Sequence, residues 1–213
     1  MKKRTLEILE IFDDMYGSEL FTYLEHHTPE ELLVATILSA QCTDARVNIV
    51  TKDLFVKYPD MYAFAAADQA ELEQDIHSTG FYHSKAKNII GAAKIICEKY
   101  GGKVPETLEE LTALPGVGRK TANVVLGNVF HKPSIVVDTH VKRISKRLGL
   151  TKETDPVKVE MDLMKELPED HWIIYNLHLI TFGREICTAR SPKCGGCRLY
   201  KYCKDNESKK NSK

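Results

Sequence analysis

The stretch LTALPGVGRKTANVVL, residues 111–126, carries the strongest local signal for the fold. Pro115 ends an incoming helix because it lacks the backbone N–H that would continue the ladder. Gly116 and Gly118 permit a tight turn whose backbone no side chain covers. The pattern predicts a helix, a hairpin and a second helix. Two glycines alone would fit an ordinary interhelical turn, but Leu-Pro-Gly-Val-Gly followed by two basic residues is much more specific.

This hairpin also predicts a phosphate contact. The second helix should restart at Arg119 or Lys120, so its first N–H groups have no partner within the helix and lie at the positive end of its dipole. With bare backbone at Gly116 and Gly118, a phosphate can approach these groups closely. Because no base edge takes part, the contact would not depend on base sequence.

The rest of the chain has helical patterns almost throughout. Capping boxes at Thr28–Glu31 and Thr107–Glu110 each precede apolar residues at helical spacing. The one strand-like stretch, residues 135–137, is too short for a sheet, so we expect a buried extended connector and an all-α fold. Helix ends are expected at glycines that can adopt positive φ, namely Gly17, Gly80, Gly101, Gly102 and Gly149.

Composition excludes some classes of protein. The chain has 213 residues, 43% of them hydrophobic, which is enough for a buried core. No apolar run approaches the roughly 20 residues of a membrane-spanning helix, so no membrane partner is expected. The basic start at residues 1–4 resembles a signal peptide, but Glu7, Glu10 and Asp13 interrupt any apolar segment. We therefore expect the protein in a reducing cytoplasm.

Charge is divided unequally along the sequence although the formal net charge is zero. Residues 1–113 contain 11 Lys and Arg against 19 Asp and Glu, whereas residues 114–213 contain 19 against 11. A basic half of this kind is typical of a surface that binds a polyanion. A solvated surface without a ligand explains the charges equally well, because halves of a sequence need not be faces of a molecule.

Four cysteines near the end of the chain indicate a metal centre. Cys187, Cys194, Cys197 and Cys203 follow the spacing C-x6-C-x2-C-x5-C. Zinc ribbons usually have two C-x-x-C pairs and this segment has one, so the spacing favours a four-iron cluster over zinc. Two disulfides are a third reading, which a reducing cytoplasm disfavours.

Together these features resemble the endonuclease III family of DNA glycosylases. The match runs in the family's order from about residue 28 to Cys203. The resemblance rests on the hairpin at 114–123, the Val-Asp-Thr-His stretch at 137–140, the cysteine frame, and upstream segments at 38–44 and 80–88.

The resemblance implies a two-lobed helix-hairpin-helix fold that binds DNA at a cleft. One lobe would be a helical barrel, residues 22–132, and the other an iron-sulfur domain, residues 1–21 with 133–213, holding a [4Fe-4S] cluster. The implied activity is bifunctional: removal of oxidised pyrimidines from double-stranded DNA, followed by strand cleavage at the abasic site. We expect a monomer acting on damaged duplex in the nucleoid.

The family's catalytic lysine falls on Lys120 and its catalytic aspartate on Asp138. Attack on the sugar C1′ and formation of a Schiff base require a neutral amine, which a helix N-terminus, Arg119 and desolvation by bound DNA would favour. Asp138 would accept or relay a proton, or stabilise positive charge on the sugar. A purely structural role is also open, because Asp138 or Thr139 can cap a helix over residues 141–150.

Two loops are implied to read the damage. An enzyme that acts on a base must extrude it from the duplex, and the gap has to be filled. Gln41 matches the family residue that enters opposite the orphaned base. Phe81 occupies the wedge position, where the family more often has leucine. The alternative is that Phe81 anchors the core after the helix end at Gly80.

Basic residues near the cluster complete the expected DNA contacts. Arg190 and Lys193 lie on a short loop between the first two cysteines, where a structural cluster would hold them toward phosphates. His140 could contact a phosphate or form a local hydrogen bond. The pairs 142–143 and 146–147 recur four residues apart and can point one way on a helix.

Three other functions fit parts of the pattern. A mismatch-adenine glycosylase of the same superfamily shares the hairpin and the cluster, but usually lacks a lysine at the position of Lys120. A non-catalytic helix-hairpin-helix DNA-binding module with zinc would leave Lys120 and Asp138 without a joint purpose. A small electron carrier is the weakest alternative, because it would not need a phosphate-binding turn.

Overall fold

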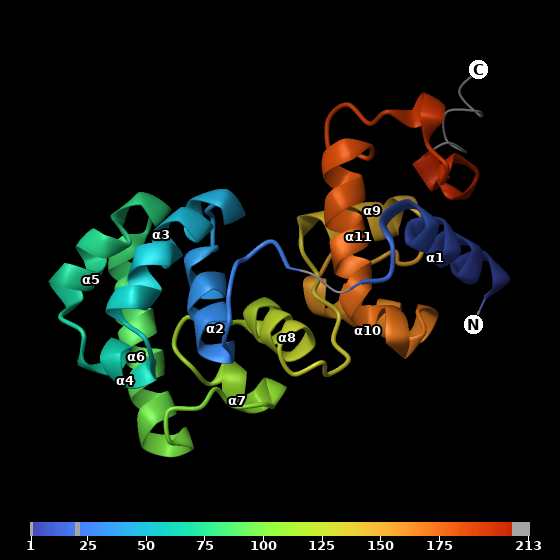
Figure 1. Cartoon of the computed structure of the whole chain (residues 1–213). Coiled ribbons are helices and arrows are strands. Elements are labelled where there is room, and N and C mark those ends of the chain that lie inside the picture. Colours follow the sequence, from blue (N-terminus) through green and yellow to red (C-terminus); the bar gives the residue numbers. More distant parts are fainter. Residues whose placement is uncertain (1, 20–21, 206–213) are drawn as a thin grey trace. The chain divides into compact units, whose positions relative to one another are not determined.

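The computed structural model describes residues 2–19 and 22–205. Within these ranges the chain is helical and contains no strand, which confirms the all-α prediction (Figure 1). The helices are α1 (Lys3–Tyr16), α2 (Pro29–Leu38), α3 (Asp44–Lys57), α4 (Met61–Ala66), α5 (Gln69–Asp75), α6 (Tyr82–Tyr100), α7 (Leu108–Thr112), α8 (Arg119–Asn128), α9 (Thr139–Arg147), α10 (Pro156–Glu166) and α11 (Trp172–Glu185). Short 3-10 turns cover His77–Thr79, Glu169–His171, Cys194–Gly196 and Tyr200–Tyr202.

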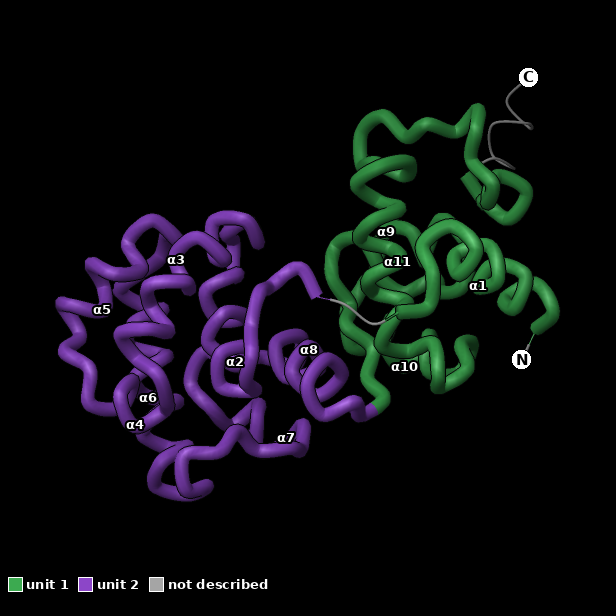
Figure 2. Tube along the Cα trace, in the orientation of Figure 1, with its two compact units in different colours: residues 1–21, 133–213 green, residues 22–132 purple. Residues whose placement is uncertain are grey.

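The chain forms two compact units, drawn in different colours in Figure 2. Residues 22–132 make one, and residues 1–21 with 133–213 make the other. Each unit has its own buried apolar cluster. The functions expected for the two units stay predictions.

In the unit 22–132, α6 is the central helix. Both α4 and α5 pack against it, while α2 contacts α3 and α8, and α7 contacts α8. Ala86, Ile89, Ala93 and Ile96 of α6 are buried at helical spacing, which places one apolar face of this helix in the core. The hairpin between α7 and α8 is therefore anchored on a packed helical body.

The second unit joins the two ends of the sequence. Helix α1 contributes Ile8 and Phe12 to a core made otherwise by α9, α10, α11 and the C-terminal turns. The Phe12 ring packs edge-on against Phe182, with ring centroids 5.4 Å apart. Burial of these side chains stabilises the association of segments far apart in sequence.

Local start and stop signals have the expected effects. Thr28 accepts a hydrogen bond from the Glu31 N–H at 3.2 Å, and Thr107 accepts one from the Glu110 N–H at 3.2 Å. The stretch 135–137 lies outside any helix or strand, and two of its three residues are buried. Positive φ is found at the predicted helix-ending glycines, Gly17, Gly80, Gly101, Gly102 and Gly149. None of the described helices is long and apolar enough to cross a membrane.

The separation of charge is smaller in the folded units than in the sequence halves. Residues 22–132 contain 11 Lys and Arg against 14 Asp and Glu, and the other unit contains 19 against 16. The acidic N-terminal helix joins the basic C-terminal part, and the hairpin cations Arg119 and Lys120 join the acidic unit. A single basic lobe is therefore not the basis for binding a polyanion.

Candidate functional site

The predicted helix-hairpin-helix is present between α7 and α8. Gly116 adopts a φ of 75°, where L residues are strained. A Cβ at Gly116 would also lie 2.7 Å from the Asn88 side chain. The turn therefore requires glycine for two reasons, the positive φ and the close approach of Asn88. Gly118 is the N-cap of α8, which begins at Arg119, one of the two expected starts.

The N-terminal end of α8 is open to a ligand. Its first intrahelical hydrogen bond runs from the Ala122 N–H to the Gly118 carbonyl at 3.0 Å, and no side chain caps the helix. A Cβ at Gly118 would meet nothing within 4 Å, so packing within the protein does not explain this glycine. A bare helix N-terminus of this kind favours an anion, in particular a phosphate.

Lys120 is the second residue of α8, and its side chain is exposed. Within residues 22–132 its ammonium has neither a hydrogen-bond nor an ion-pair partner, unlike Lys132, which pairs with Glu106 at 3.0 Å. The amine is thus carried by the first turn of a helix and is accessible to a reacting group.

Asp138 is the N-cap of α9. Its Oδ1 accepts a hydrogen bond from the Val141 N–H at 2.7 Å, so the capping role is real and belongs to Asp138 rather than to Thr139. The helix ends at Arg147, three residues earlier than expected. The second oxygen, Oδ2, has no hydrogen bond in the described part of its unit. One carboxylate oxygen is therefore structural and the other is available for chemistry.

Gln41 and Phe81 are both exposed, and both adopt positive φ, 55° and 51°. The left-handed region costs a non-glycine residue about 1–3 kcal/mol and persists only where the surroundings impose it. Phe81 is 64% exposed, so the alternative that it anchors the core is wrong. The structure presents an amide and an aromatic ring at the surface, each on a backbone held in an unusual conformation.

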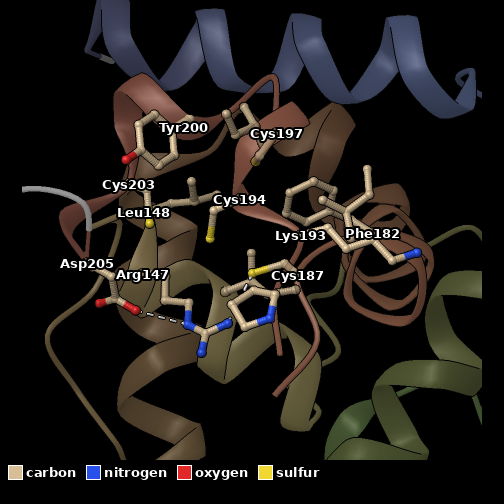
Figure 3. A pocket seen from close by; sticks show the side chains of 14 residues that line it. Arg147, Leu148, Phe182, Cys187, Lys193, Cys194, Cys197, Tyr200, Cys203 and Asp205 are labelled. Carbon is tan, nitrogen blue, oxygen red and sulfur yellow. Dashed lines mark hydrogen bonds and ion pairs between the residues drawn. The ribbon is translucent and has the colours of Figure 1, made fainter. Parts of the chain in front are cut away.

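The four cysteines of the predicted metal centre line one cavity (Figure 3). No disulfide joins any of the six cysteines, so the structure gives the disulfide reading no support. Cys187 follows α11, and the other three lie on or beside the two C-terminal 3-10 turns. The walls are largely apolar, with Leu148, Phe182 and Leu199 among them. Four cysteines that line one largely apolar cavity are a suitable ligand set for a soft-metal centre.

The four cysteines of this cavity are the candidate ligands of the metal centre. Among the described residues, no three His, Cys, Asp or Glu side chains converge closely enough to hold one ion. In a four-iron cluster each cysteine binds a different iron, so the sulfurs can stand farther apart. Burial raises the pKa of Cys197, the backbone of Leu199 opposes this, and the other three cysteines add to it. Positive metal charge is what would hold four such groups as thiolates.

Two arginines of α9 support the cysteine loop, a role that the sequence reading missed. Arg143 donates to the Cys187 carbonyl at 2.9 Å, and Arg147 donates to the Cys187 Sγ at 3.2 Å and the Thr188 carbonyl at 3.1 Å. Basic residues four apart on a helix were expected to face DNA, but these two face the loop. Their spacing was visible in the sequence, whereas their partner, 40 or more positions later, was not.

The other residues predicted to contact DNA differ in their exposure to solvent. Arg190 and Lys193 are exposed on the loop between the first two cysteines, whose closure includes a hydrogen bond from the Lys193 N–H to the Ile186 carbonyl at 2.9 Å. The half-buried His140 ring has Nδ1 3.4 Å from Arg143 Nη2, which supports the local reading of that residue.

Comparisons with known proteins agree with this arrangement. Residues 34–169 match the HhH-GPD superfamily of base excision DNA repair proteins, and residues 187–203 match the iron-sulfur binding domain of endonuclease III. Endonuclease III of Synechocystis sp. is 54% identical over 203 residues, 95% of this chain and 92% of that protein. Endonuclease III of Bacillus subtilis is 51% identical over 209 residues, covering 96% and 95%.

Solved structures give the same result. A trapped covalent intermediate of an endonuclease III with DNA, an estranged-adenine complex, has a TM-score of 0.90 and 44% identity. The alignment covers 99% of this chain and 100% of that one. A non-covalent endonuclease III–DNA complex has a TM-score of 0.91 at the same identity and coverage.

Proposed function

The chain belongs to the endonuclease III family of base excision DNA repair proteins, and from this membership we propose that it is a DNA glycosylase and abasic-site lyase. Its substrate is double-stranded DNA carrying an oxidised pyrimidine. The observation that carries the proposal is an exposed lysine, Lys120, at the open N-terminal end of the hairpin helix. A phosphate at Gly116 and Gly118 would position the DNA backbone beside this amine.

Lys120 is the nucleophile. Its amine attacks C1′ of the damaged nucleotide, and the base leaves with the electron pair of the glycosidic bond. Opening of the sugar ring converts the new C–N bond into a Schiff base, and loss of a C2′ proton then expels the 3′-phosphate, which cuts the strand. A covalent intermediate trapped in a related endonuclease III supports this route.

Asp138 is assigned to proton transfer or to stabilisation of positive charge on the sugar. Oδ1 is committed to the Val141 N–H, which fixes the orientation of the carboxylate, and Oδ2 remains for chemistry. We assign Oδ2 to accepting or relaying a proton, or to stabilising positive charge on the sugar. A held carboxylate needs little reorganisation during the reaction, which is an advantage over a freely rotating one.

Gln41 and Phe81 are assigned to the gap left by the extruded base, the former opposite the orphaned base and the latter as a wedge. Their exposure and held backbones support this assignment. Arg119, Arg190 and Lys193 are assigned to phosphates, since all three are charged residues on or next to the two expected contact loops.

Phe81→Ala is expected to weaken binding to a duplex with a stable abasic-site analogue roughly tenfold, because stacking of a base on an aromatic ring contributes about 1–3 kcal/mol. Binding to undamaged duplex should change little, as no gap exists there. Fluorescence anisotropy measures both. Tyr62→Ala, an equally large loss of an exposed aromatic ring at 56% exposure, is the matched control. Unchanged affinity of Phe81→Ala for the abasic duplex would refute the wedge.

Cys187, Cys194, Cys197 and Cys203 hold a [4Fe-4S] cluster, and residues 187–203 are the family's iron-sulfur domain. We propose that the cluster is structural: when bound, it ties the loop with Arg190 and Lys193 to the protein. The chain's own contribution is the pair of arginines on α9, which hold the same loop from the other side.

Arg147→Ala is expected to accelerate loss of the cluster roughly tenfold, because partners of metal ligands typically affect metal affinity by about 10–100-fold. The variant loses the hydrogen bond to Cys187 Sγ and two bonds to loop carbonyls. Decay of the visible absorbance in the presence of a chelator measures it. Lys146→Ala removes an exposed neighbouring charge and should decay like the parent. Equal decay of both variants would show that Arg147 does not stabilise the site.

The test of the function is borohydride trapping on a duplex containing thymine glycol, with an A·G mismatch duplex and undamaged DNA beside it. A covalent adduct and strand cleavage on the thymine glycol duplex alone are expected. Adenine release from the mismatch without cleavage would instead favour the mismatch-adenine glycosylase. Tight DNA binding with no product from any duplex would leave a non-catalytic binding module. We further propose that the protein acts as a monomer in the nucleoid.

A further inference from the structure

We propose that Lys85 is a positioning residue that holds Gln41 and Phe81 in one fixed register for entry into the duplex. The inference rests on the proposed function, because it gives both residues a place in the gap. It assigns a role to a lysine that neither contacts DNA nor takes part in the chemistry.

Lys85 is buried, which is unusual for a lysine. Its exposed fraction is 4%, although it lies in the first turn of α6, only four residues after the exposed Phe81. The ammonium donates two hydrogen bonds to main-chain carbonyls, to Leu38 at 2.7 Å and to Thr79 at 2.9 Å. Burial lowers the pKa of Lys85, and the nearby Cys42 opposes that shift.

Both acceptors are the last residues of helical segments. Leu38 ends α2, and Thr79 ends the 3-10 turn His77–Thr79. The final carbonyls of a helix lack intrahelical partners and form the negative end of its dipole, so they attract a cation. An ammonium between two such ends recovers part of its lost hydration without a carboxylate. Lys85 therefore serves as a common hydrogen-bond donor to the C-terminal ends of two helical segments.

These two ends lead directly into the two loops. Gln41 follows Leu38 by three residues, and Phe81 follows Thr79 by two. The backbone N–H of Lys85 also donates to the Phe81 carbonyl at 3.1 Å, so one residue holds the Phe81 loop at two points. Lys85 is thus bonded to Thr79 and to Phe81, on either side of Gly80, and to Leu38 in the segment that precedes Gln41.

Such a clamp accounts for the two unusual backbones. Gln41 and Phe81 both keep positive φ, which non-glycine residues adopt only when their surroundings impose it. A shared donor imposes it on both loops at once. On binding DNA, two side chains already in register lose less conformational freedom than side chains on two independent loops. The difference should appear as higher affinity for a duplex that lacks a base, and not for the undamaged duplex.

The test is the Lys85→Met variant, which keeps an unbranched side chain of similar length and removes the donors. Affinity is measured by anisotropy for a duplex with a tetrahydrofuran abasic-site analogue and for the undamaged duplex. A loss of about tenfold on the first and less than twofold on the second is expected. Lys94→Met removes an exposed charge from the same helix and should match the parent on both duplexes. Equal losses of Lys85→Met on both duplexes, or none, would overturn the proposal.

A second test combines Lys85→Met with removal of both loop side chains. If Lys85 acts through the loops, Lys85→Met should add less than twofold to the loss already caused by Gln41→Ala and Phe81→Ala together. A multiplicative loss would show that Lys85 acts elsewhere. If Lys85→Met does not fold, a double-mutant cycle of Gln41→Ala and Phe81→Ala in the parent protein still tests whether the two loops are held together. Loops held in one register predict coupling of about threefold or more, and independent losses would contradict them.

The affinities of the parent and of Lys85→Met distinguish a failure of the proposed function from a failure of the role of Lys85. A parent protein that bound the abasic and undamaged duplexes equally would overturn the proposed function together with this inference. A parent that discriminates between them, beside a Lys85→Met variant that discriminates equally well, would overturn the role of Lys85 alone.

Discussion

Lys120→Ala should give no borohydride-trapped adduct on a thymine glycol duplex and should lower base excision by at least about 1000-fold. The substitution removes the only group assigned to form the covalent bond. The fold should be unaffected, because alanine is the best helix former and the side chain is exposed. Trapping on a denaturing gel and single-turnover excision measure the two effects.

The matched control is Lys94→Ala, which removes another exposed lysine from the same unit. It should trap and excise like the parent. Undiminished trapping by Lys120→Ala would transfer the nucleophile to another amine and refute the assignment. Loss of trapping with full excision would instead mean that Lys120 serves only the lyase step.

Asp138→Asn should fold and bind abasic-analogue duplex like the parent but lose about 10²–10⁴-fold in turnover, the usual range for a group that transfers a proton. Asparagine caps a helix about as well as aspartate, so the hydrogen bond from the Val141 N–H should survive. The negative charge and the proton-accepting capacity of Oδ2 are lost. Single-turnover excision, thermal unfolding and anisotropy separate these effects.

Asp155→Asn is the control for the capping role. Asp155 caps α10 by accepting from the Lys158 N–H at 3.0 Å, in the same geometry and the same unit. Both variants should change the melting temperature by a similarly small amount, and only Asp138→Asn should lose turnover. Parallel losses of stability with full activity would reduce Asp138 to a helix cap.

Much of the fold could be read from residues three or four positions apart. Capping threonines, helix-ending glycines and the start of α8 at Arg119 follow from interactions within one turn of helix, where the sequence lists both partners side by side. The cysteine frame was readable for another reason: thiolates at that spacing have few uses besides binding metal. The resemblance to a known family rests on these same local patterns.

Contacts between distant segments could not be read in this way. Arg147 was expected to face DNA, and its bond to Cys187 depends on how α9 packs beside the end of α11. The core-anchor reading of Phe81 failed because local sequence does not tell which side of a loop faces solvent. Charge counted along the chain was misleading, since α1 folds with the C-terminal part.

The sequence by itself determined the all-α class, the hairpin with its open helix end and the frame of four cysteines, whereas the roles of Lys120 and Asp138 come from the family resemblance and stay proposals. The first three features depend on short-range hydrogen bonding and on the chemistry of single side chains. Tertiary structure decided that Lys85 is buried between two helix ends, that Gln41 and Phe81 take left-handed backbones, and that one oxygen of Asp138 is committed. Each of these depends on packing that brings together groups which the sequence keeps apart.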